Sequence, residues 1–185
     1  MPSEKQAFER IVRKTFEELY RFALCLGGEE EAAAELVRQT FRARAGTSAP
    51  LAETEESLLW LYTTLYRLFI AQAAEEPVPV TEARNDDDLD NYLLLDCPRD
   101  KVNELEPQDV LEAFWQIPPG QRPALALHYL GKRSYKEIAR IVDATPETAM
   151  KRVARGKRAF RRALAAKIAA RSRRILASET NNDPL

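Results

Sequence analysis

Apolar residues recur at three- and four-residue spacing through the first part of the chain, with polar residues between them. The first such stretch covers residues 8–26 and is stopped by Gly27 and Gly28. A second covers residues 29–45 and opens with three glutamates, which suit the positive end of a helix dipole. A third covers about residues 53–74. This pattern predicts three amphipathic helices that bury their apolar faces against each other in a small bundle.

A second group of helical stretches follows, over residues 107–117 and 121–130. Ser134 is a good N-cap for the next helix. Thr145 is a good N-cap for the last helix, residues 146–176, which starts with a proline at the position where a missing N–H has no cost. The chain is therefore expected to be all-α, with two small helical domains.

Residues 75–106 separate the two groups and show no sustained period. They contain 11 acidic and 3 basic residues together with several prolines, which is typical of a flexible acidic linker. Within it, residues 91–96 ("NYLLLD") are a candidate for a short docked turn. The expected organisation is a helical bundle over 1–74, the linker over 75–106, a helix-turn-helix domain over 107–176 and a tail over 177–185.

The composition narrows the class of protein. At 45% apolar and 31% charged residues the chain is globular rather than disordered. It has no run of 18 apolar residues and a polar N-terminus, so it is expected to be cytoplasmic rather than membrane-spanning or secreted. Its two cysteines are far apart and its single histidine has no partner spacing, so neither a metal site nor a cofactor is expected. The sequence offers no catalytic constellation, and an enzyme is not expected.

Charge divides the chain more sharply than its net value of −1 suggests. Residues 1–120 contain 12 Lys and Arg against 24 Asp and Glu, whereas residues 121–175 contain 16 Lys and Arg against 3 acidic residues. This asymmetry indicates that the C-terminal part faces nucleic acid and that the N-terminal part has another task.

The stretch from Ser134 to Arg158 has the pattern of a helix-turn-helix. Small residues at Ala139 and Ala149 would let two helices cross closely around a short turn. The outer face would then be basic, and arginine can pair with guanine in a major groove. The alternative to DNA binding is a basic helix face that contacts only solvent. The candidate DNA-binding residues are Arg133, Thr148, Lys151, Arg152, Arg155, Lys157 and Arg158.

The segment "LEAFWQIPPGQRPALALHYLGKRSYKEIARIVDATPETAMKRVARGKRAFRRAL" resembles region four of bacterial sigma factors, especially the extracytoplasmic-function (ECF) group. A LuxR-type domain shares "KEIA", but Arg152 and the "RGKR" that follows favour the sigma pattern. The resemblance implies recognition of a promoter minus-thirty-five element. The positions that match are Arg122, Tyr129, Ser134, Tyr135, Glu137, Ile138, Ala139, Thr148, Arg152, Arg155 and Gly156.

The segment "LYRFALCLGGEEEAAAELVRQTFRAR" is similar to sigma region two, whose helix docks on core RNA polymerase. The resemblance implies polymerase-binding residues at Glu35, Leu36, Val37, Gln39, Thr40 and Phe41. "WLY" at residues 60–62 resembles the start of the family helix that supports the unpaired minus-ten strand. The candidate strand contacts are Trp60, Tyr62, Tyr66 and Arg67, although the helical spacing of the aromatic residues also suits a core.

Region two diverges from the family pattern. The Asn and Asp of the strand-binding helix are replaced by Arg67 and Ala71, and the family Gln-Glu pair becomes Arg38-Gln39. In the C-terminal turn the family glycine is Asp143, which tolerates a left-handed conformation better than most residues.

Three functions are therefore open. The leading one is an ECF-type sigma factor that directs core RNA polymerase to promoter DNA. The second is a sigma-like decoy that binds an anti-sigma factor, which leaves the basic C-terminal part unexplained. The third is a stand-alone helix-turn-helix regulator. In the C-terminal stretch, extra phosphate contacts and a plain helix end are equally supported alternatives for Lys167, Arg171, Arg173 and Arg174.

Overall fold

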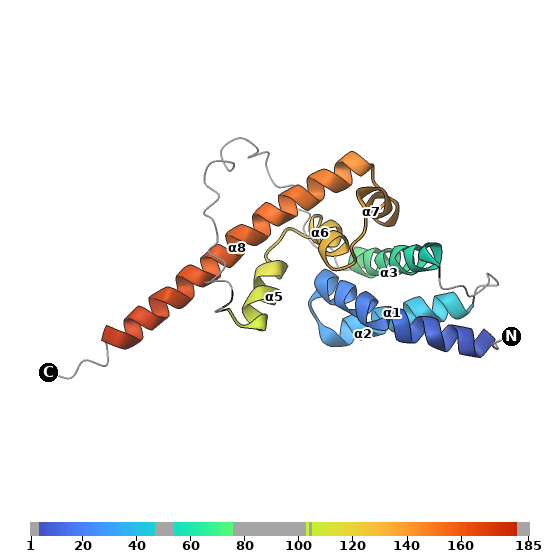
Figure 1. Ribbon diagram of the computed structural model, residues 1–185, viewed down its shortest axis with the longest axis horizontal. Helices are drawn as coiled ribbons and strands as arrows, with labels where there is room; N and C mark the ends of the chain where they lie inside the picture. The colour runs from blue at the N-terminus through green and yellow to red at the C-terminus, as the bar shows by residue number, and fades with distance from the viewer. Residues whose placement is uncertain (1–3, 47–53, 76–102, 104, 181–185) are drawn as a thin grey trace.

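A computed structural model describes residues 4–46, 54–75, 103 and 105–180, and over these residues the chain forms seven α-helices and no strand. The expected all-α fold is confirmed. The suggested turn at residues 91–96 lies outside the described residues. The helices are α1 (Glu4–Gly27), α2 (Glu30–Ala45), α3 (Glu55–Glu75), α5 (Pro107–Trp115), α6 (Arg122–Tyr129), α7 (Tyr135–Ile141) and α8 (Pro146–Thr180) (Figure 1).

Helices α1, α2 and α3 form the N-terminal bundle. Gly28 joins α1 to α2 with a φ of 83°, a left-handed conformation that a glycine adopts without steric cost. Helix α2 runs back along α1, and α3 packs against both (Figure 1). The bundle core contains Leu19, Val37 and Leu65, each fully buried. These are the apolar positions that the helical period predicted.

The C-terminal helices are held by local caps and by a second small core. The hydroxyl of Ser134 accepts from the backbone N–H of Glu137, and Glu137 accepts in return from the N–H of Ser134 at 2.8 Å, so α7 has a complete capping box. Thr145 accepts from the N–H of Thr148 at 3.2 Å and caps α8. Both predicted N-caps are confirmed. Helix α5 lies along α8 through the edge-to-face rings of Phe114 and Phe160.

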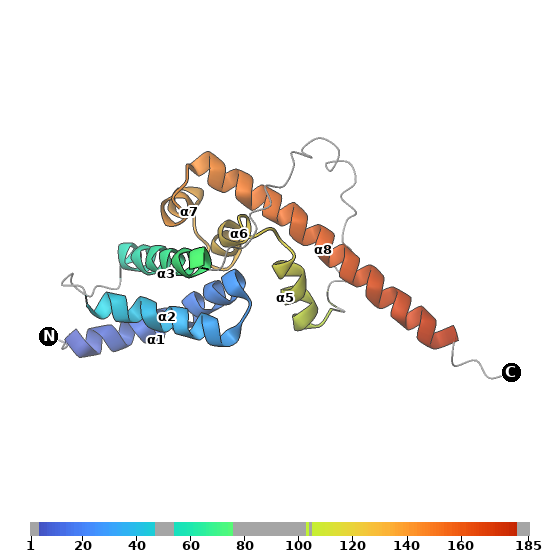
Figure 2. The same ribbon diagram turned by 180° about the vertical axis from the view of Figure 1, so that it is seen from behind.

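Helix α8 is a single element of 35 residues, four residues longer than expected at its C-terminal end. Figures 1 and 2 show that its far end projects past α5 and away from the other helices. Gly156 does not break it, because this glycine is buried where α8 meets α6: a Cβ there would lie 3.3 Å from the Leu125 side chain. None of the described helices combines the length and the apolar character needed to cross a membrane.

The two helical groups lie directly against each other. Contacts join α1 to α6 and α3 to α7, and one continuous cluster of buried apolar side chains runs from α1, α2 and α3 into α6, α7 and the start of α8. The helix-turn-helix and the bundle therefore form one packed body. The sequence, which predicts two helical domains joined by a linker, does not predict this packing.

Candidate nucleic-acid interface

Helices α7 and α8 form the helix-turn-helix that the sequence predicts. Ala139 is 5% exposed and Ala149 is fully buried, and small side chains at these positions let α7 and α8 pack closely. Ile138 and Val153 fill the core beneath the crossing. The turn between the helices contains Asp143 at a φ of 49°, as its tolerance of the left-handed region suggests.

The basic residues of α8 lie around its solvent side. Lys151 and Lys157 are exposed, while Thr148, Arg152, Arg155 and Arg158 are partly covered. Arg161 and Arg162, which the sequence analysis did not single out, are exposed in the next turn. The spacing of three and four residues places Lys151, Arg155, Arg158 and Arg162 on one side of the helix. This side offers a row of cations to a phosphate backbone.

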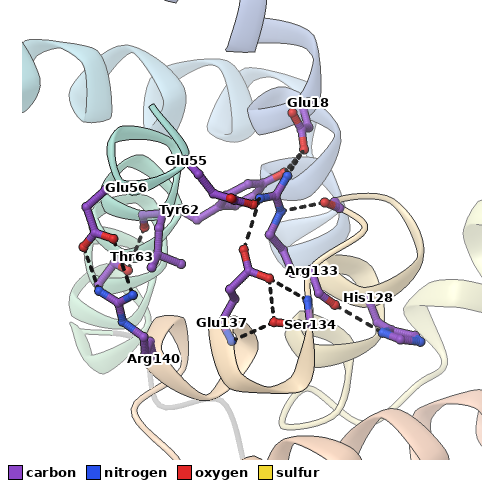
Figure 3. Close-up of polar contacts among 12 residues, drawn as sticks. Glu18, Glu55, Glu56, Tyr62, Thr63, His128, Arg133, Ser134, Glu137 and Arg140 are labelled. Atoms are coloured by element: carbon purple, nitrogen blue, oxygen red, sulfur yellow. Dashed lines mark hydrogen bonds and ion pairs between the residues drawn. The ribbon is translucent and has the colours of Figure 1, made fainter. Parts of the chain in front are cut away.

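Arg133 lies elsewhere. It stands in the loop before α7, only 12% of its side chain is exposed, and it turns toward the N-terminal bundle rather than toward solvent (Figure 3). Its guanidinium approaches carboxylates from α1, α3 and α7, and its Nε donates to the carbonyl of Gly131 at 2.6 Å. In this arrangement Arg133 is not available to DNA.

The first turns of α8 also approach the bundle. Tyr66 of α3 is half-buried, and its pKa is raised by burial and partly lowered again by the positive charge of Arg152. Arg152 is therefore close enough to act on a residue of α3.

The distal part of α8 is partly neutralised by α5. The ammonium of Lys167 binds Glu112 and lies 3.8 Å from Asp109, and Arg171 lies 3.9 Å from the same aspartate. The pKa of Glu112 is lowered by its hydrogen bond with Lys167. Two of the four candidates for extra phosphate contacts therefore have protein carboxylates as partners, whereas Arg173 and Arg174 are exposed.

The residues assigned to polymerase binding on α2 divide into two sets. Leu36, Val37, Thr40 and Phe41 are buried in the bundle core. Glu35 and Gln39 lie at the surface, where the amide of Gln39 donates to Glu35 at 3.1 Å. Arg38 and Arg42 flank the same carboxylate, at 2.7 Å and 4.0 Å. A partner protein would meet this polar face of α2 rather than the apolar positions of the motif.

The candidate contacts of the minus-ten strand on α3 also differ in how exposed they are. Tyr62 is 1% exposed and belongs to the core, in edge-to-face contact with Phe22 at 5.2 Å. Trp60 is half-buried beneath the guanidinium of Arg44, which lies 5.4 Å from its ring centre. Tyr66 is half-buried and Arg67 is exposed. Core packing therefore accounts for Tyr62, as its helical spacing suggested.

Three aromatic rings form a cluster at the surface beside α7. The rings of His128 and Tyr135 stack at 5.1 Å, and Tyr129 meets His128 edge to face at 5.0 Å. Tyr129 is 52% exposed and Tyr135 is 37% exposed. Both tyrosines match the family pattern, but that match does not predict a role for them.

Comparison with known proteins agrees with this architecture. The family model of sigma-70 region 4 matches residues 108–160, which run from α5 into the first half of α8. The chain is also 26% identical to the ECF RNA polymerase sigma factor SigM of Bacillus subtilis (strain 168), over 136 residues that make up 73% of this chain and 81% of that protein. The match to sigma-70 region 4 and the similarity to an ECF sigma factor over most of the chain both support an ECF-type sigma factor.

Proposed function

We propose that the chain directs core RNA polymerase to promoters, and that α7 and α8 recognise the minus-thirty-five element. The observation that carries this proposal is the capped, closely crossed helix pair with a row of cations on α8, in the segment that matches sigma-70 region 4. The activity would place the chain in the cytoplasm with the polymerase.

In the proposed complex the N-terminal turns of α8 enter the major groove. Thr148, Lys151 and Arg152 are nearest the helix start and would meet base edges. Arg155, Lys157 and Arg158 follow and would meet phosphates, which position the helix without carrying sequence information. Arg133 would join them only after leaving its place against the bundle.

The proposed polymerase contact is the polar face of α2. Glu35 and Gln39 are the two motif positions with exposed atoms, and Arg38 and Arg42 surround them. The buried positions Leu36 and Phe41 would contribute by fixing the shape of the helix pair, not by touching the partner. For the unpaired minus-ten strand, the proposed contacts are Arg67 and the exposed parts of Trp60 and Tyr66, since Tyr62 is enclosed.

Transcription from a library of randomised promoters tests the proposal. The purified chain is added to core polymerase, and transcripts are sequenced to find enriched upstream motifs. A shared minus-thirty-five motif that appears only with the chain is the expected result. Transcripts without any enriched motif would contradict it.

A second assay separates a sigma factor from a stand-alone regulator. Core polymerase should co-purify with the chain, and Glu35→Lys together with Gln39→Lys should weaken that association. The control is Glu17→Lys with Glu31→Lys, which changes two exposed glutamates on α1 and α2 outside the proposed contact. Changing Leu36 or Phe41 is not informative, because removing a buried side chain destabilises the bundle itself.

A further inference from the structure

The first turns of α8 pack on the rest of the molecule by one side. Ala149 is fully buried and Val153 is 4% exposed. Gly156 is buried as well, against the Leu125 side chain of α6. Figures 1 and 2 show α7 against the same turns. A partner of the recognition helix must therefore meet the opposite side of α8.

The exposed positions of these turns lie on that opposite side. They recur at steps of three and four residues, which places them on one face of the helix. They are Glu147, Met150, Lys151 and Ala154. Arg152 is only partly exposed and lies toward α3, where its charge acts on Tyr66. The outermost side chains at the start of α8 therefore include a methionine to which the sequence analysis gave no role.

Met150 is unusual among the side chains of α8. It is 48% exposed, and it is the only large apolar side chain that is exposed on this helix over residues 146–174, whose side chains the structure describes. An exposed apolar side chain is stabilised when another apolar group covers it and displaces water. Met150 therefore favours a partner that presents an apolar group at this point of the helix.

Glu147, one turn earlier on the same face, is engaged with the end of its own helix. Its pKa is lowered first by a hydrogen bond from its own backbone N–H and then by the hydroxyl of Thr145. The carboxylate is thus ionised and held at the first turn of α8. Met150 and Lys151 are left as the outermost long side chains that can extend from the helix start into a groove.

Two rows of side chains continue from Met150 and Lys151 along α8, each with steps of three and four residues. One row contains Met150, Ala154, Lys157 and Arg161, and the other contains Lys151, Arg155, Arg158 and Arg162. The first row is therefore apolar for its first two members and basic after them. In a major groove the first turns of a recognition helix meet base edges, whereas phosphates position the helix. The apolar members lie in the part that would meet base edges.

The edges of the base pairs offer an apolar side chain one matching group. Adenine, guanine and cytosine present hydrogen-bond donors and acceptors in the major groove, whereas thymine also presents its C5-methyl group. A methionine pressed against a donor or acceptor would leave that polar group without a partner, which is unfavourable. The unbranched side chain of methionine adapts its shape to an apolar contact.

We propose that Met150 is a specificity-determining residue that packs on the C5-methyl group of a thymine in the minus-thirty-five element. Ala154 is the next member of the same row, and its small side chain leaves the base pair room to approach. The proposal rests on the function proposed above and adds a base preference to it.

The first test repeats transcription from the randomised promoter library with core polymerase and four full-length chains. Met150→Gln puts a polar amide in place of the thioether, and Met150→Leu keeps an apolar side chain. Ala166→Gln is the matched control, because it puts the same amide at an exposed position further along α8. One position of the minus-thirty-five motif should prefer thymine with the unchanged protein, with Met150→Leu and with Ala166→Gln. Met150→Gln should lose the preference at that position alone.

The second test removes the methyl group from the DNA. The preferred thymine of a selected promoter is replaced by deoxyuridine, which pairs in the same way but lacks the C5-methyl group. The complex of the unchanged protein with core polymerase should bind this duplex about fourfold more weakly, as expected for one buried methyl group. The Met150→Gln complex should distinguish the two duplexes by less than about 1.5-fold, because the partner of the methyl group is already absent. The slope of log affinity against log salt concentration should be equal for both complexes, since Met150 contacts no phosphate.

An unchanged motif with Met150→Gln would overturn the proposal. An equal effect of deoxyuridine in both complexes would do the same, because another group would then read the methyl. Loss of the whole motif with Met150→Gln but not with Ala166→Gln would also reject it, because Met150 would then support docking of the domain rather than read one base. If the unchanged protein yields no motif, the proposed function fails and the thymine contact fails with it. A clear motif that Met150→Gln does not alter leaves the function standing and rejects the thymine contact alone.

Discussion

The hydroxyl of Tyr62 donates a hydrogen bond of 2.8 Å to the carboxylate of Glu18, a residue 44 positions earlier in the chain. The same carboxylate oxygen lies 3.5 Å from the guanidinium of Arg133, 115 positions later than Glu18. One glutamate of α1 thus connects the core of the bundle to the loop before the helix-turn-helix. The buried tyrosine supports the interface from beneath.

Tyr62→Phe should lower the free energy of unfolding by about 1 to 2 kcal/mol near neutral pH, because a partly buried hydrogen bond to a charged acceptor is lost. The pKa of Tyr62 is raised above its ordinary value of 10.0 by burial and by Glu18. Its contribution is therefore fully present below pH 10.0 and is lost as the pH rises from there toward the raised pKa, since only the unfolded chain releases the proton.

Urea unfolding of both proteins, at about pH 8 and about pH 11, checks this prediction. The advantage of the unchanged protein should shrink by about 1.4 kcal/mol for each pH unit above 10.0. An advantage that stays constant up to about pH 11 would show that the phenol ionises equally in both states.

Gly28→Ala should destabilise the chain by about 1 to 2 kcal/mol through its backbone alone, because a φ of 83° is costly for a residue with a Cβ. The new methyl group would also lie 3.2 Å from the indole of Trp115, so the last turn of α1 and the end of α5 would be pushed apart. Gly120→Ala is the matched control, since its φ is in the ordinary range and nothing lies within 4 Å of a Cβ there. Thermal unfolding followed by circular dichroism compares the two, and equal midpoints would contradict the prediction.

Cys25 should be chemically inert in the folded chain. Burial raises its pKa from 9.0 to about 11, against a smaller opposing effect of the Arg122 charge, and its side chain is enclosed by the bundle. In a Cys97→Ser variant, a thiol reagent at about pH 8 should modify Cys25 at least a hundredfold more slowly than in denaturant. The reason is that only a small fraction of the Cys25 thiol is ionised in the folded chain and that the bundle shields the thiol from the reagent. Rapid modification without denaturant would show that the bundle opens far more often than its packing implies.

Local chemistry is what the sequence predicted well. The caps at Ser134 and Thr145 and the left-handed turn at Asp143 depend on residues within a few positions, and each was found where it was expected. The apolar period also placed the core. By contrast, the family resemblance predicts that Leu36 and Phe41 contact polymerase, whereas their helical spacing predicts that they are buried. In the structure both side chains are buried.

Ion pairs between residues far apart in the sequence could not be predicted in this way. Arg133 and Lys167 were both counted as part of a basic surface, yet one is held by Glu18 and the other by Glu112. Ion pairs between residues far apart in sequence follow no period, and the acidic partners were counted as part of the opposite half. The sequence therefore does not predict that the helix-turn-helix packs on the bundle.

Lys151→Ala and Lys167→Ala give a direct test of which cations of α8 meet DNA. Lys151 is exposed beside the start of the recognition helix, whereas Lys167 is held by Glu112 and Asp109. If Lys151 neutralises one phosphate, its loss should lower the slope of log affinity against log salt concentration by about 1, while the loss of Lys167 should leave it unchanged. Each removes one charge from the same helix, so a general field effect would move both slopes equally. Duplex binding measured across a range of salt concentrations decides the matter, and equal slopes for the two variants would reject the proposed recognition face.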